Sequence, residues 1–426
     1  MAKEDMIVGL DIGTTKVCAI VAEVDVSGEL RVVGVGTSPS EGLRRGVVVN
    51  VEKTVQSIQK AVGEAEMMAG VKIESVYVGI GGEHIRSINS RGVIAVSGPD
   101  HEITATDQTR VIDAARAVSI PPDRQVIHVL PQEFTVDEQS GIKEPIGMSG
   151  VRLEAEVHIV TGAVTSVQNL IKSVSRAGIE VVEPVLEPIA ASHSVLSPDE
   201  QEMGVALVDI GGGATNLAVF YEGSVRHTAV IGLGGQNVTN DVAIGLRTPW
   251  QQAERIKQDY GCALQSEVAA EETITVPGVA GRVSYQIPRR ELAAIIEPRM
   301  EEIFSLVFKE IRRTEYADLL SAGIVLTGGG SLLNGVSKLA EQVFDMPVNA
   351  GLPQGVGGLI DTINAPSYAT GVGLVLYGHR VRSRNDRVKI PETPGGLMGW
   401  LKNLVTGIFG CRLDFTLRDP IYAALA

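Results

Sequence analysis

The chain has 426 residues, of which 44% are apolar and only 4% aromatic, and it carries a formal net charge of −14. This length predicts two to four domains or one large two-lobed body. The negative charge disfavours nucleic acid as a partner, and any attraction to an anionic membrane must come from a local basic segment.

The cysteines and the apolar runs narrow the class of protein further. Cys18, Cys262 and Cys411 form no CxxC pair, which argues against a structural zinc site and a disulfide-stapled secreted fold. The N-terminal segment shows no secretory signal, and no apolar run is long enough to span a bilayer. We therefore expect a cytosolic body.

Strands and helices alternate through residues 5–82 and again through 163–203, which together are expected to form the first lobe. The runs MIVGLDIG and KVCAIVAEV predict a β-hairpin, and SVYVGIGG predicts a buried strand that ends in glycines. An amphipathic helix is expected between them, with an apolar face made of Val51, Val55, Ile58 and Val62.

Residues 83–162 have a different pattern, and we interpret them as a small inserted α+β subdomain. ATDQTRVIDAARAV predicts a helix capped by Thr106 or Asp107. RLEAEVHIV alternates apolar and polar residues, as a strand with two different faces would.

A second αβ half occupies residues 204–378. ALVDIGGGATNLAVF repeats the opening pattern of strand, Asp-Ile-Gly turn and strand, with Asp209 in the place of Asp11. AGIVLTGGGSLLNGV then predicts a strand, a triple glycine and a helix. The repeat predicts two lobes of like topology.

Two hairpins with glycine and hydroxyl residues at their turns can clamp a polyphosphate from both sides. Lys16 supplies a positive charge, and Asp11 and Asp209 at the strand ends could hold a hydrated Mg²⁺. Either DxG turn alone could be only a turn, and a lone GGG could serve helix packing. The chain has no GxxxxGK[ST] P-loop and no GxGxxG after a strand, so neither of those nucleotide-binding schemes is favoured.

The order of these segments resembles that of the actin, Hsp70 and sugar-kinase ATPase superfamily, and more narrowly that of the FtsA family of bacterial cell-division proteins. The resemblance covers about residues 5–409 and rests on the two hairpins, the EPIAA helix start, TGGGS and YATGVGLVLYG. It implies an α/β, two-lobed actin-like ATPase fold with an inserted small α+β subdomain and a C-terminal amphipathic helix.

The resemblance implies ATP and Mg²⁺ as ligands and assigns residues to them. In AERIKQDYG, Glu254 and Lys257 lie one helical turn apart and match a pair that contacts ribose and adenine, although alone they could be an exposed charge pair. The full nucleotide-binding set is Asp11, Gly13, Thr14, Thr15, Lys16, Asp209, Gly211, Gly212, Gly213, Thr215, Asn216, Gly234, Gly235, Glu254, Lys257, Gly328, Gly329, Gly330 and Ser331.

Glu187 matches the residue that orients the attacking water in actin relatives, although it also begins a helix ahead of Pro188. The sequence offers no phosphate-acceptor pocket and no strong base. We therefore expect ATP binding with slow hydrolysis at most, the nucleotide acting as a switch that closes the lobes.

The chain changes character after residue 378. Residues 379–396 form a basic linker rich in Pro and Gly, and residues 397–410 predict an amphipathic helix that lies in a membrane interface. A core helix that closes the domain is the alternative. Residues 411–426 are a tail without a motif. The lipid-facing residues are expected to be Leu397, Trp400, Leu401, Leu404, Val405, Ile408 and Phe409.

The segment SYQIPRRELAAIIEPRMEEIFSLVFKEIRR predicts a partner surface. We expect basic residues there to lie beside an apolar helix face made of Ile295, Ile296, Ile303 and Phe304. A solvated helix face is the alternative. The resemblance implies contact with the C-terminal tail of the tubulin-like protein FtsZ, with Arg289, Arg290, Arg299 and Glu302 as candidates.

Taken together, the resemblance implies an actin-like protein that polymerises on the cytoplasmic side of the inner membrane at the division septum. Its partners would be FtsZ, further copies of itself, other division proteins and anionic lipid. An Hsp70-type chaperone would need a peptide-binding domain after residue 378, and a sugar kinase would need a catalytic aspartate. A pilus-assembly relative would lack the basic linker and lipid helix.

Overall fold

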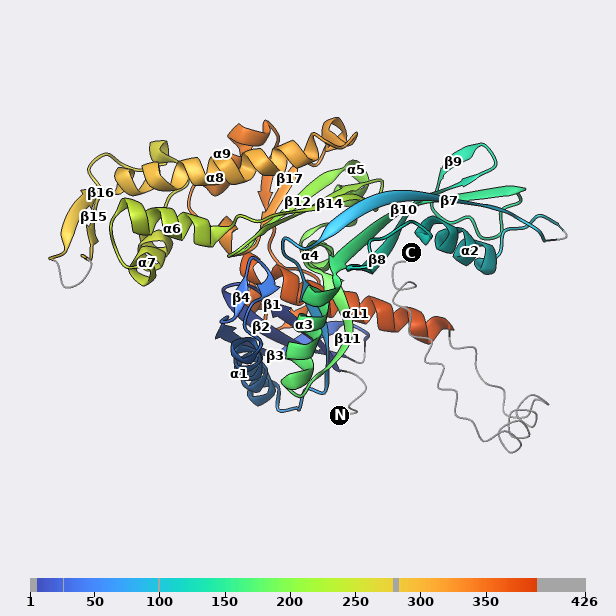
Figure 1. Cartoon of the computed structure of the whole chain (residues 1–426), viewed down its shortest axis with the longest axis horizontal. Coiled ribbons are helices and arrows are strands. Elements are labelled where there is room, and N and C mark those ends of the chain that lie inside the picture. Colours follow the sequence, from blue (N-terminus) through green and yellow to red (C-terminus); the bar gives the residue numbers. More distant parts are fainter. Residues whose placement is uncertain (1–5, 26, 99, 279–282, 389–426) are drawn as a thin grey trace.

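The computed structural model describes residues 6–25, 27–98, 100–278 and 283–388 of the chain. Figure 1 shows two sheet-containing lobes that meet at the centre. One arm, with helices α6 to α8, extends to one side, and a second arm, the inserted segment with β7 to β10 and α2, extends to the other. The predicted membrane helix and tail lie outside the described residues. No helix in the described part is long and apolar enough to cross a membrane.

The first lobe is built on a six-stranded sheet in the order β11-β6-β1-β2-β3-β19. Its strands are β1 Met6–Ile12, β2 Lys16–Val24, β3 Leu30–Pro39, β6 Ser75–Ile80, β11 Glu180–Leu186 and β19 Gly357–Gly358. Helices α1 Val51–Ala69 and α3 Val164–Arg176 cover one face, where they pack on Val8, Leu10 and Ile12. Helix α11 Ala369–Val388 covers the other face, where it packs on Ile7, Cys18 and Ile20. A short hairpin of β4 Leu43–Arg44 and β5 Val47–Val48 lies between β3 and α1.

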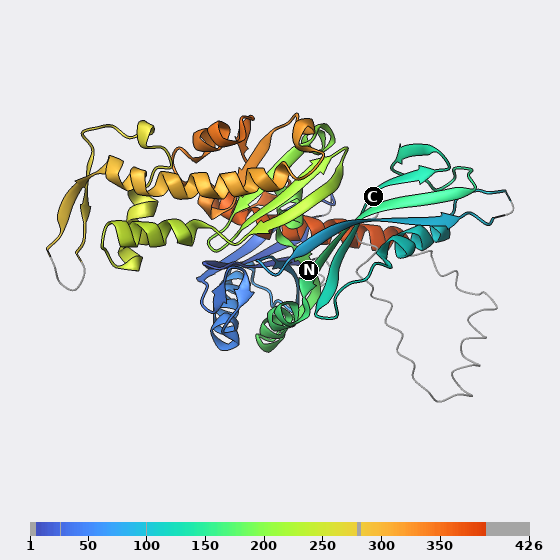
Figure 2. The same ribbon diagram turned by 45° about the horizontal axis from the view of Figure 1, so that its top comes forward.

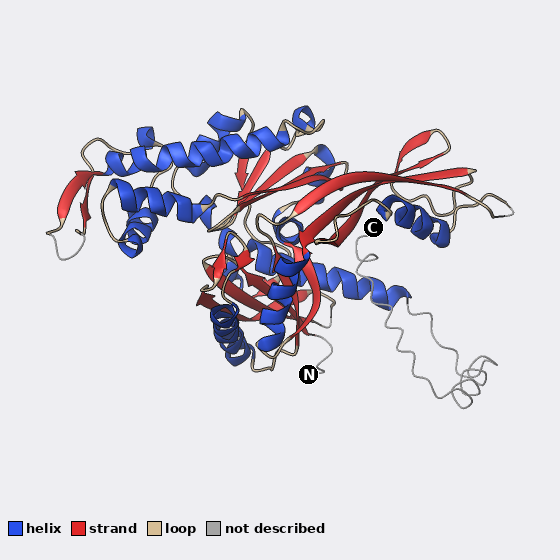
Figure 3. Ribbon diagram, viewed as in Figure 1, coloured by secondary structure: helices blue, strands red, loops and turns tan. Residues whose placement is uncertain are grey.

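The second lobe repeats this topology in a sheet ordered β14-β13-β12-β17-β18. In both lobes an antiparallel three-strand unit is followed by two parallel strands. The strands are β12 Val205–Ile210, β13 Thr215–Tyr221, β14 Ser224–Ile231, β17 Ile324–Thr327 and β18 Val348–Ala350. The main helices are α6 Gly235–Gly245, α7 Trp250–Tyr260, α8 Arg289–Ile311 and α9 Val336–Phe344, with a hairpin of β15 Thr273–Val276 and β16 Tyr285–Pro288 at the far end (Figure 3).

Helices α4 Glu187–Val195 and α11 join the two lobes. Helix α4 contacts both α11 and strands β12 and β13. Gly373 makes this crossing possible, because a Cβ there would lie 1.8 Å from the carbonyl oxygen of Ala190. Helix α5 Pro198–Met203 and the short helix α10 Ile360–Ile363 complete the connections.

The inserted segment forms a separate four-stranded sheet in the order β7-β10-β8-β9. Its elements are β7 Arg86–Ala95, α2 Ala105–Arg116, β8 Arg124–Val136, β9 Gln139–Ile142 and β10 Arg152–Ala163. Helix α2 covers the face that carries Leu153, Ala155, Val157 and Ile159, the apolar face predicted from the sequence. The predicted cap, Thr106 or Asp107, was wrong by two or three residues. The N-cap is Thr104, which forms a capping box with Asp107, because a cap lies outside the helix while Asp107 is its third residue.

The insert is bonded to the edge strand β14 of the second lobe, although the chain enters and leaves it through the first lobe. The amide of Gln132 donates to the carbonyl of Val225 at 2.8 Å. The hydroxyl of Ser87 donates to the backbone carbonyl of Thr228, also at 2.8 Å. His158 lies between Asn89 and the hydroxyl of Thr228 at 2.6 and 2.9 Å, and burial lowers its pKa to about 3. Side chains of the insert thus occupy carbonyls that an edge strand leaves unpaired. Figure 2 shows both arms on the two sides of this junction.

Arg226 is the charged centre of this contact. It is 3% exposed and pairs with Glu133 of the insert at 3.2 Å and with Glu222 at 2.8 Å. Its guanidinium also lies 5.4 Å from the ring centroid of Tyr316. A buried arginine with these partners costs free energy to replace, because both carboxylates lose their cation.

We predict that Arg226→Met lowers the free energy of unfolding by about 2 kcal/mol, measured by urea denaturation. Arg313→Met is the matched control, because Arg313 is 60% exposed in its pair with Glu310. The control is expected to cost about 0.5 kcal/mol or less. Equal effects of the two substitutions would show that the Arg226 contact is no stronger than a surface ion pair.

Candidate functional site

The two DxG hairpins have the same backbone geometry. The N–H of Gly13 donates to the carbonyl of Lys16, and the N–H of Gly211 donates to that of Ala214, both at 2.9 Å. Asp11 and Asp209 occupy equivalent positions, opposite Cys18 and Asn216 in their ladders. The repeated sequence pattern therefore produces two equivalent turns, one from each lobe.

The tips of these hairpins face each other across the cleft between the lobes. A Cβ at Gly212 would lie 2.4 Å from Cγ2 of Thr15, and a Cβ at Gly213 would lie 2.6 Å from Oγ1 of Thr14. Only glycine allows this approach, which brings backbone N–H groups of one turn close to the hydroxyls of the other.

Three carboxylates lie behind the hairpin tips. Asp11, Glu187 and Asp209 line one cavity of about 190 Å³. Desolvation raises the pKa of Asp11 and of Asp209 to about 6. Desolvation, together with the charges of Asp11 and Asp209, raises the pKa of Glu187 to about 8. The site thus concentrates negative charge that a cation can stabilise.

Two glycines leave room for these carboxylates. A Cβ at Gly81 would lie 2.2 Å from Oε2 of Glu187. A Cβ at Gly328, whose φ is +82°, would lie 2.2 Å from Oδ1 of Asp209. Asn216 donates its amide to Oε2 of Glu187 at 2.9 Å, while its own buried Oδ1 has no partner. The cavity therefore contains a fixed carboxylate and an acceptor that remains to be satisfied.

Lys16 connects the first hairpin to the start of α11. Its ammonium donates to the carbonyl of Ser367 at 2.6 Å and lies 3.9 Å from the ring centroid of Tyr368. Its positive charge also lowers the pKa of Asp11 and so partly offsets the increase that desolvation causes. Lys16 is the lysine that lines both cavities of the cleft.

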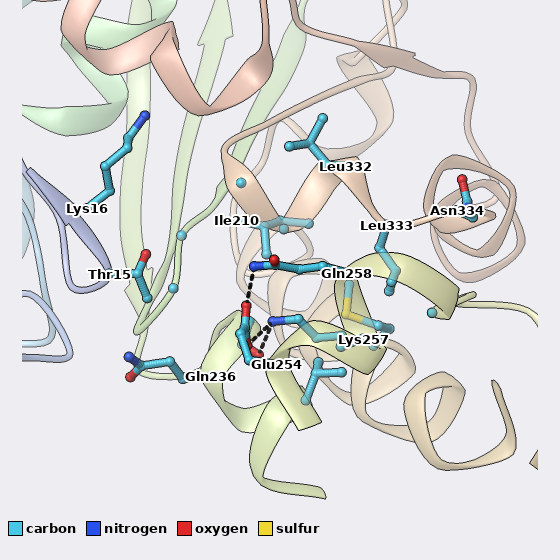
Figure 4. Close-up of a pocket in the computed structure, with 18 residues that line it drawn as sticks. Thr15, Lys16, Ile210, Gln236, Glu254, Lys257, Gln258, Leu332, Leu333 and Asn334 are labelled. Atoms are coloured by element: carbon cyan, nitrogen blue, oxygen red, sulfur yellow. Dashed lines mark hydrogen bonds and ion pairs between the residues drawn. The ribbon is translucent and has the colours of Figure 1, made fainter. Parts of the chain in front are cut away.

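A larger cavity of about 540 Å³ continues from the hairpin tips into the second lobe. Figure 4 shows it bounded by Gln236, Glu254, Lys257 and Gln258 on one side and by Leu332, Leu333 and Asn334 on another. Thr15, Lys16 and Gly212 line both cavities, so the two spaces adjoin. A polar end lined by glycines and an end with apolar side chains suit the phosphates and the base of one nucleotide.

Most of the residues predicted to bind nucleotide surround this cleft. Those that line at least one cavity are Asp11, Gly13, Thr14, Thr15, Lys16, Asp209, Gly211, Gly212, Gly213, Asn216, Gly235, Glu254, Lys257, Gly328, Gly329 and Gly330. Thr215, Gly234 and Ser331 do not. The hydroxyl of Thr215 donates to Leu233 at 2.9 Å, and that of Ser331 donates to Gly328 at 2.8 Å, so both hydroxyls bond the backbone beside the cleft.

Sequence reasoning missed several lining residues. Gly46, Pro366, Ser367 and Thr370 line the small cavity, and Val238, Met300, Leu333 and Asn334 line the larger one. Thr370 belongs to the quoted run YATGVG, so that segment carried a signal. The apolar residues carried none, because apolar positions that line a cavity have the same pattern as core positions.

The donor set fits a hydrated Mg²⁺, which takes few protein carboxylates and keeps several waters. Asp11 and Asp209 end equivalent strands, and Asp209 is 6% exposed. Across residues 6–388, gaps excepted, no group of three or more His, Cys, Asp or Glu side chains is arranged to hold a metal ion directly.

The predicted partner surface on α8 is corrected in one respect. Ile296, Ile303 and Phe304 are fully buried in the core of the second lobe, so they cannot bind a partner. The helix pattern identified an apolar face but not that α6 and α9 cover it. Arg290 and Glu302 are exposed, Arg299 pairs with Asp241 at 2.6 Å, and Arg289 pairs with Glu272 at 2.6 Å.

Comparison with known proteins identifies two family models in the chain. Residues 206–373 match the family described as "Cell division protein FtsA", and residues 82–161 match "SHS2 domain inserted in FTSA". A cell division protein FtsA of Pseudomonas aeruginosa is 55% identical over 378 residues, which cover 89% of this chain and 90% of that protein. The FtsA of Escherichia coli K12 is 40% identical over 406 residues, which cover 94% and 96%.

Solved structures are similar in fold at low sequence identity. The PilM–PilN type IV pilus biogenesis complex contains a chain with a TM-score of 0.64 and 16% identity, covering 88% of this chain and 98% of that one. MreB5 of Spiroplasma citri bound to ADP has a TM-score of 0.56 and 15% identity, covering 90% and 99%. The predicted two-lobed actin-like fold with an inserted subdomain is confirmed.

We predict that Glu187→Gln stabilises the protein in the absence of nucleotide and Mg²⁺, by about 2–4 kcal/mol at pH 8 and hardly at all at pH 4.5. The folded state holds Glu187 protonated up to a pKa of about 8, whereas the unfolded chain ionises at its ordinary value of 4.5. The wild type therefore loses stability as pH rises between these values, and glutamine does not.

Urea denaturation at the two pH values measures this difference. Glu271→Gln, at an exposed position of the second lobe, is the control, and its effect should be the same at both pH values. A Glu187→Gln variant with equal effects at pH 4.5 and pH 8 would contradict the raised pKa.

Proposed function

The chain belongs to the FtsA family of cell division proteins, and on that premise we propose that it binds ATP, polymerises and tethers FtsZ filaments to the membrane. The tether would act on the cytoplasmic side of the inner membrane at the division septum. The observation that carries the proposal is the pair of facing hairpins with its adjoining cavity, a site shaped for ATP between two lobes.

ATP would lie with its phosphates between residues 13–16 and 211–213 and its base in the larger cavity. Asp11 and Asp209 would hold hydrated Mg²⁺, which would offset the phosphate charge. Because ligands from both lobes would contact the same nucleotide, binding favours a closed arrangement of the lobes over an open one.

Glu187 is the candidate for positioning the attacking water. Asn216 donates to one of its carboxylate oxygens, and Glu187 lines the small cavity, where the attacking water would lie. Burial raises the pKa of Glu187 to about 8 in the absence of Mg²⁺ and nucleotide, and no histidine is among the described residues that line the small cavity. The expected consequence is slow hydrolysis, so nucleotide would act mainly as a switch.

The membrane role rests on residues 379–410. Helix α11 runs to Val388, so residues 379–388 of the predicted linker are helical, and residues 389–410 lie outside the described residues (Figure 1). Each basic residue can add about 1 kcal/mol of attraction to an anionic leaflet. One such helix binds reversibly, and a row of polymerised subunits binds more tightly through effective concentration.

The FtsZ tail would bind where α6, α7 and α8 meet. Ile244 is 77% exposed there, and Gly245 packs against Ile295 of α8. Arg299 bonds Asp241 on the same side of α6, and Arg290 is exposed near the start of α8. An apolar patch beside arginines suits an acidic and apolar tail.

Co-sedimentation with anionic liposomes tests the membrane role. Leu404→Gln, on the apolar face of the predicted helix, should weaken binding about tenfold, because it exposes a polar side chain to lipid. Thr406→Gln on the polar face is the matched control. Mg-ATP should strengthen the binding of both the wild type and the control. Unchanged binding by Leu404→Gln would remove the anchor from this helix.

Fluorescence anisotropy with a labelled FtsZ tail peptide tests the partner surface. Arg290→Glu should weaken binding about tenfold through charge repulsion and leaves the Arg299 pair intact. Arg313→Glu, beyond the end of α8, is the control. Normal binding by Arg290→Glu and by Arg299→Glu would move the tail to another surface.

A further inference from the structure

Thr239 is a buried residue of α6 that does not line the nucleotide cavity yet contacts two residues that do. Its side chain is fully buried. Its hydroxyl accepts a hydrogen bond from the ammonium of Lys257 at 2.9 Å. It also lies within bonding distance of Oε2 of Glu254 and 3.0 Å from the carbonyl of Gly235. Thr239 therefore joins α6 to α7 behind the cavity wall.

The donors of Lys257 are all used inside the protein. An ammonium has three N–H groups. They meet the carbonyl of Gly235 at 3.2 Å, the hydroxyl of Thr239 at 2.9 Å and Oε2 of Glu254 at 2.8 Å. Lys257 thus has no spare donor for a bound nucleotide, although it lines the cavity.

The acceptors of Glu254 are used unequally. Oε2 accepts from Lys257 and from Thr239. Among the described residues, Oε1 accepts from the amide of Gln258 alone, at 2.7 Å (Figure 4). A carboxylate oxygen has about two lone pairs, so Oε1 keeps one acceptor site. This remaining acceptor site on Oε1 could accept a hydrogen bond from a hydroxyl group.

We propose that Thr239 is a positioning residue that, with Lys257, fixes the Glu254 carboxylate so that Oε1 accepts from a ribose hydroxyl. This inference rests on the proposed binding of ATP. Lys257 acts on Glu254 and does not donate to the nucleotide.

The backbone links this arrangement to the phosphate loop. The N–H of Gly235 donates to the carbonyl of Gly211 at 2.9 Å, and the carbonyl of Gly235 accepts from the ammonium of Lys257 at 3.2 Å. The ribose contact and the second hairpin are therefore held in one bonded unit, and a shift of Thr239 would displace Glu254 relative to the phosphates.

Calorimetric titration of the full chain with Mg-ATP and Mg-2′-deoxy-ATP tests the proposal. The wild type should prefer ATP. Thr239→Val keeps the shape but removes the hydroxyl, and should weaken ATP binding about three- to tenfold while leaving 2′-deoxy-ATP binding nearly unchanged. Thr239→Ser restores the hydroxyl and should restore the preference.

Thr239→Ala is a second variant that adds no bulk, which keeps the test decisive if Thr239→Val fails to fold. It should lose the same preference, because it lacks the same hydroxyl. An equal loss for both nucleotides in either variant, or an unchanged preference, would overturn the positioning role. A wild type that binds neither nucleotide would instead overturn the proposed ATP site.

Discussion

Three carboxylates that meet between two lobes constrain this structure more than any other feature. Asp209 is buried, and the remaining exposed surface of Asp11 and Glu187 faces the small cavity. Asp209 raises the pKa of Asp11, and both aspartates raise that of Glu187, while Lys16 is a cation that lowers the pKa of both aspartates. Glycines at 81 and 328 make the arrangement possible by leaving no side chain beside these groups. A site of this kind is costly to the fold unless a cation and a ligand complete it.

The contacts around the site connect it to helix α11 and to the insert. The ammonium of Lys16 donates to the carbonyl of Ser367 just before α11, which ends at Val388. The insert leaves the first lobe but bonds β14 of the second through Ser87, Gln132 and His158. If the lobes moved apart, either these bonds or the position of the insert would have to change. The relative position of the lobes and the placement of the insert are therefore linked by geometry.

The sequence predicted the features that come from a repeated motif or from alternating apolar and polar residues. Two DxG hairpins in the same order indicated two equivalent lobes, and period-two alternation identified the apolar face of β10. It could not show what covers a face. The apolar side of α8 was predicted as a partner surface and is core, because an amphipathic pattern is the same in both cases. The other face of β10 was expected to be polar and contains His158, which is buried against β14.

Hydrogen bonds between side chains of different helices left no pattern in the sequence. Thr239 lies in an ordinary helical run, and only the fold brings it to Glu254 and Lys257. The Glu-x-x-Lys spacing predicted that this pair shares a helix face. It did not predict that the ammonium of Lys257 donates to Gly235, Thr239 and Glu254. Which side chains are buried and which donors already have partners depends on contacts between distant segments, and these cannot be predicted from one sequence.

A structure of the full chain with Mg²⁺ and a non-hydrolysable ATP analogue would show whether the two hairpins clamp one nucleotide. We expect the phosphates between residues 13–16 and 211–213, the metal beside Asp11 and Asp209, and the base in the cavity lined by Met300 and Leu333. Phosphates bound away from either hairpin would contradict the clamp, and with it the argument that nucleotide holds the two lobes together.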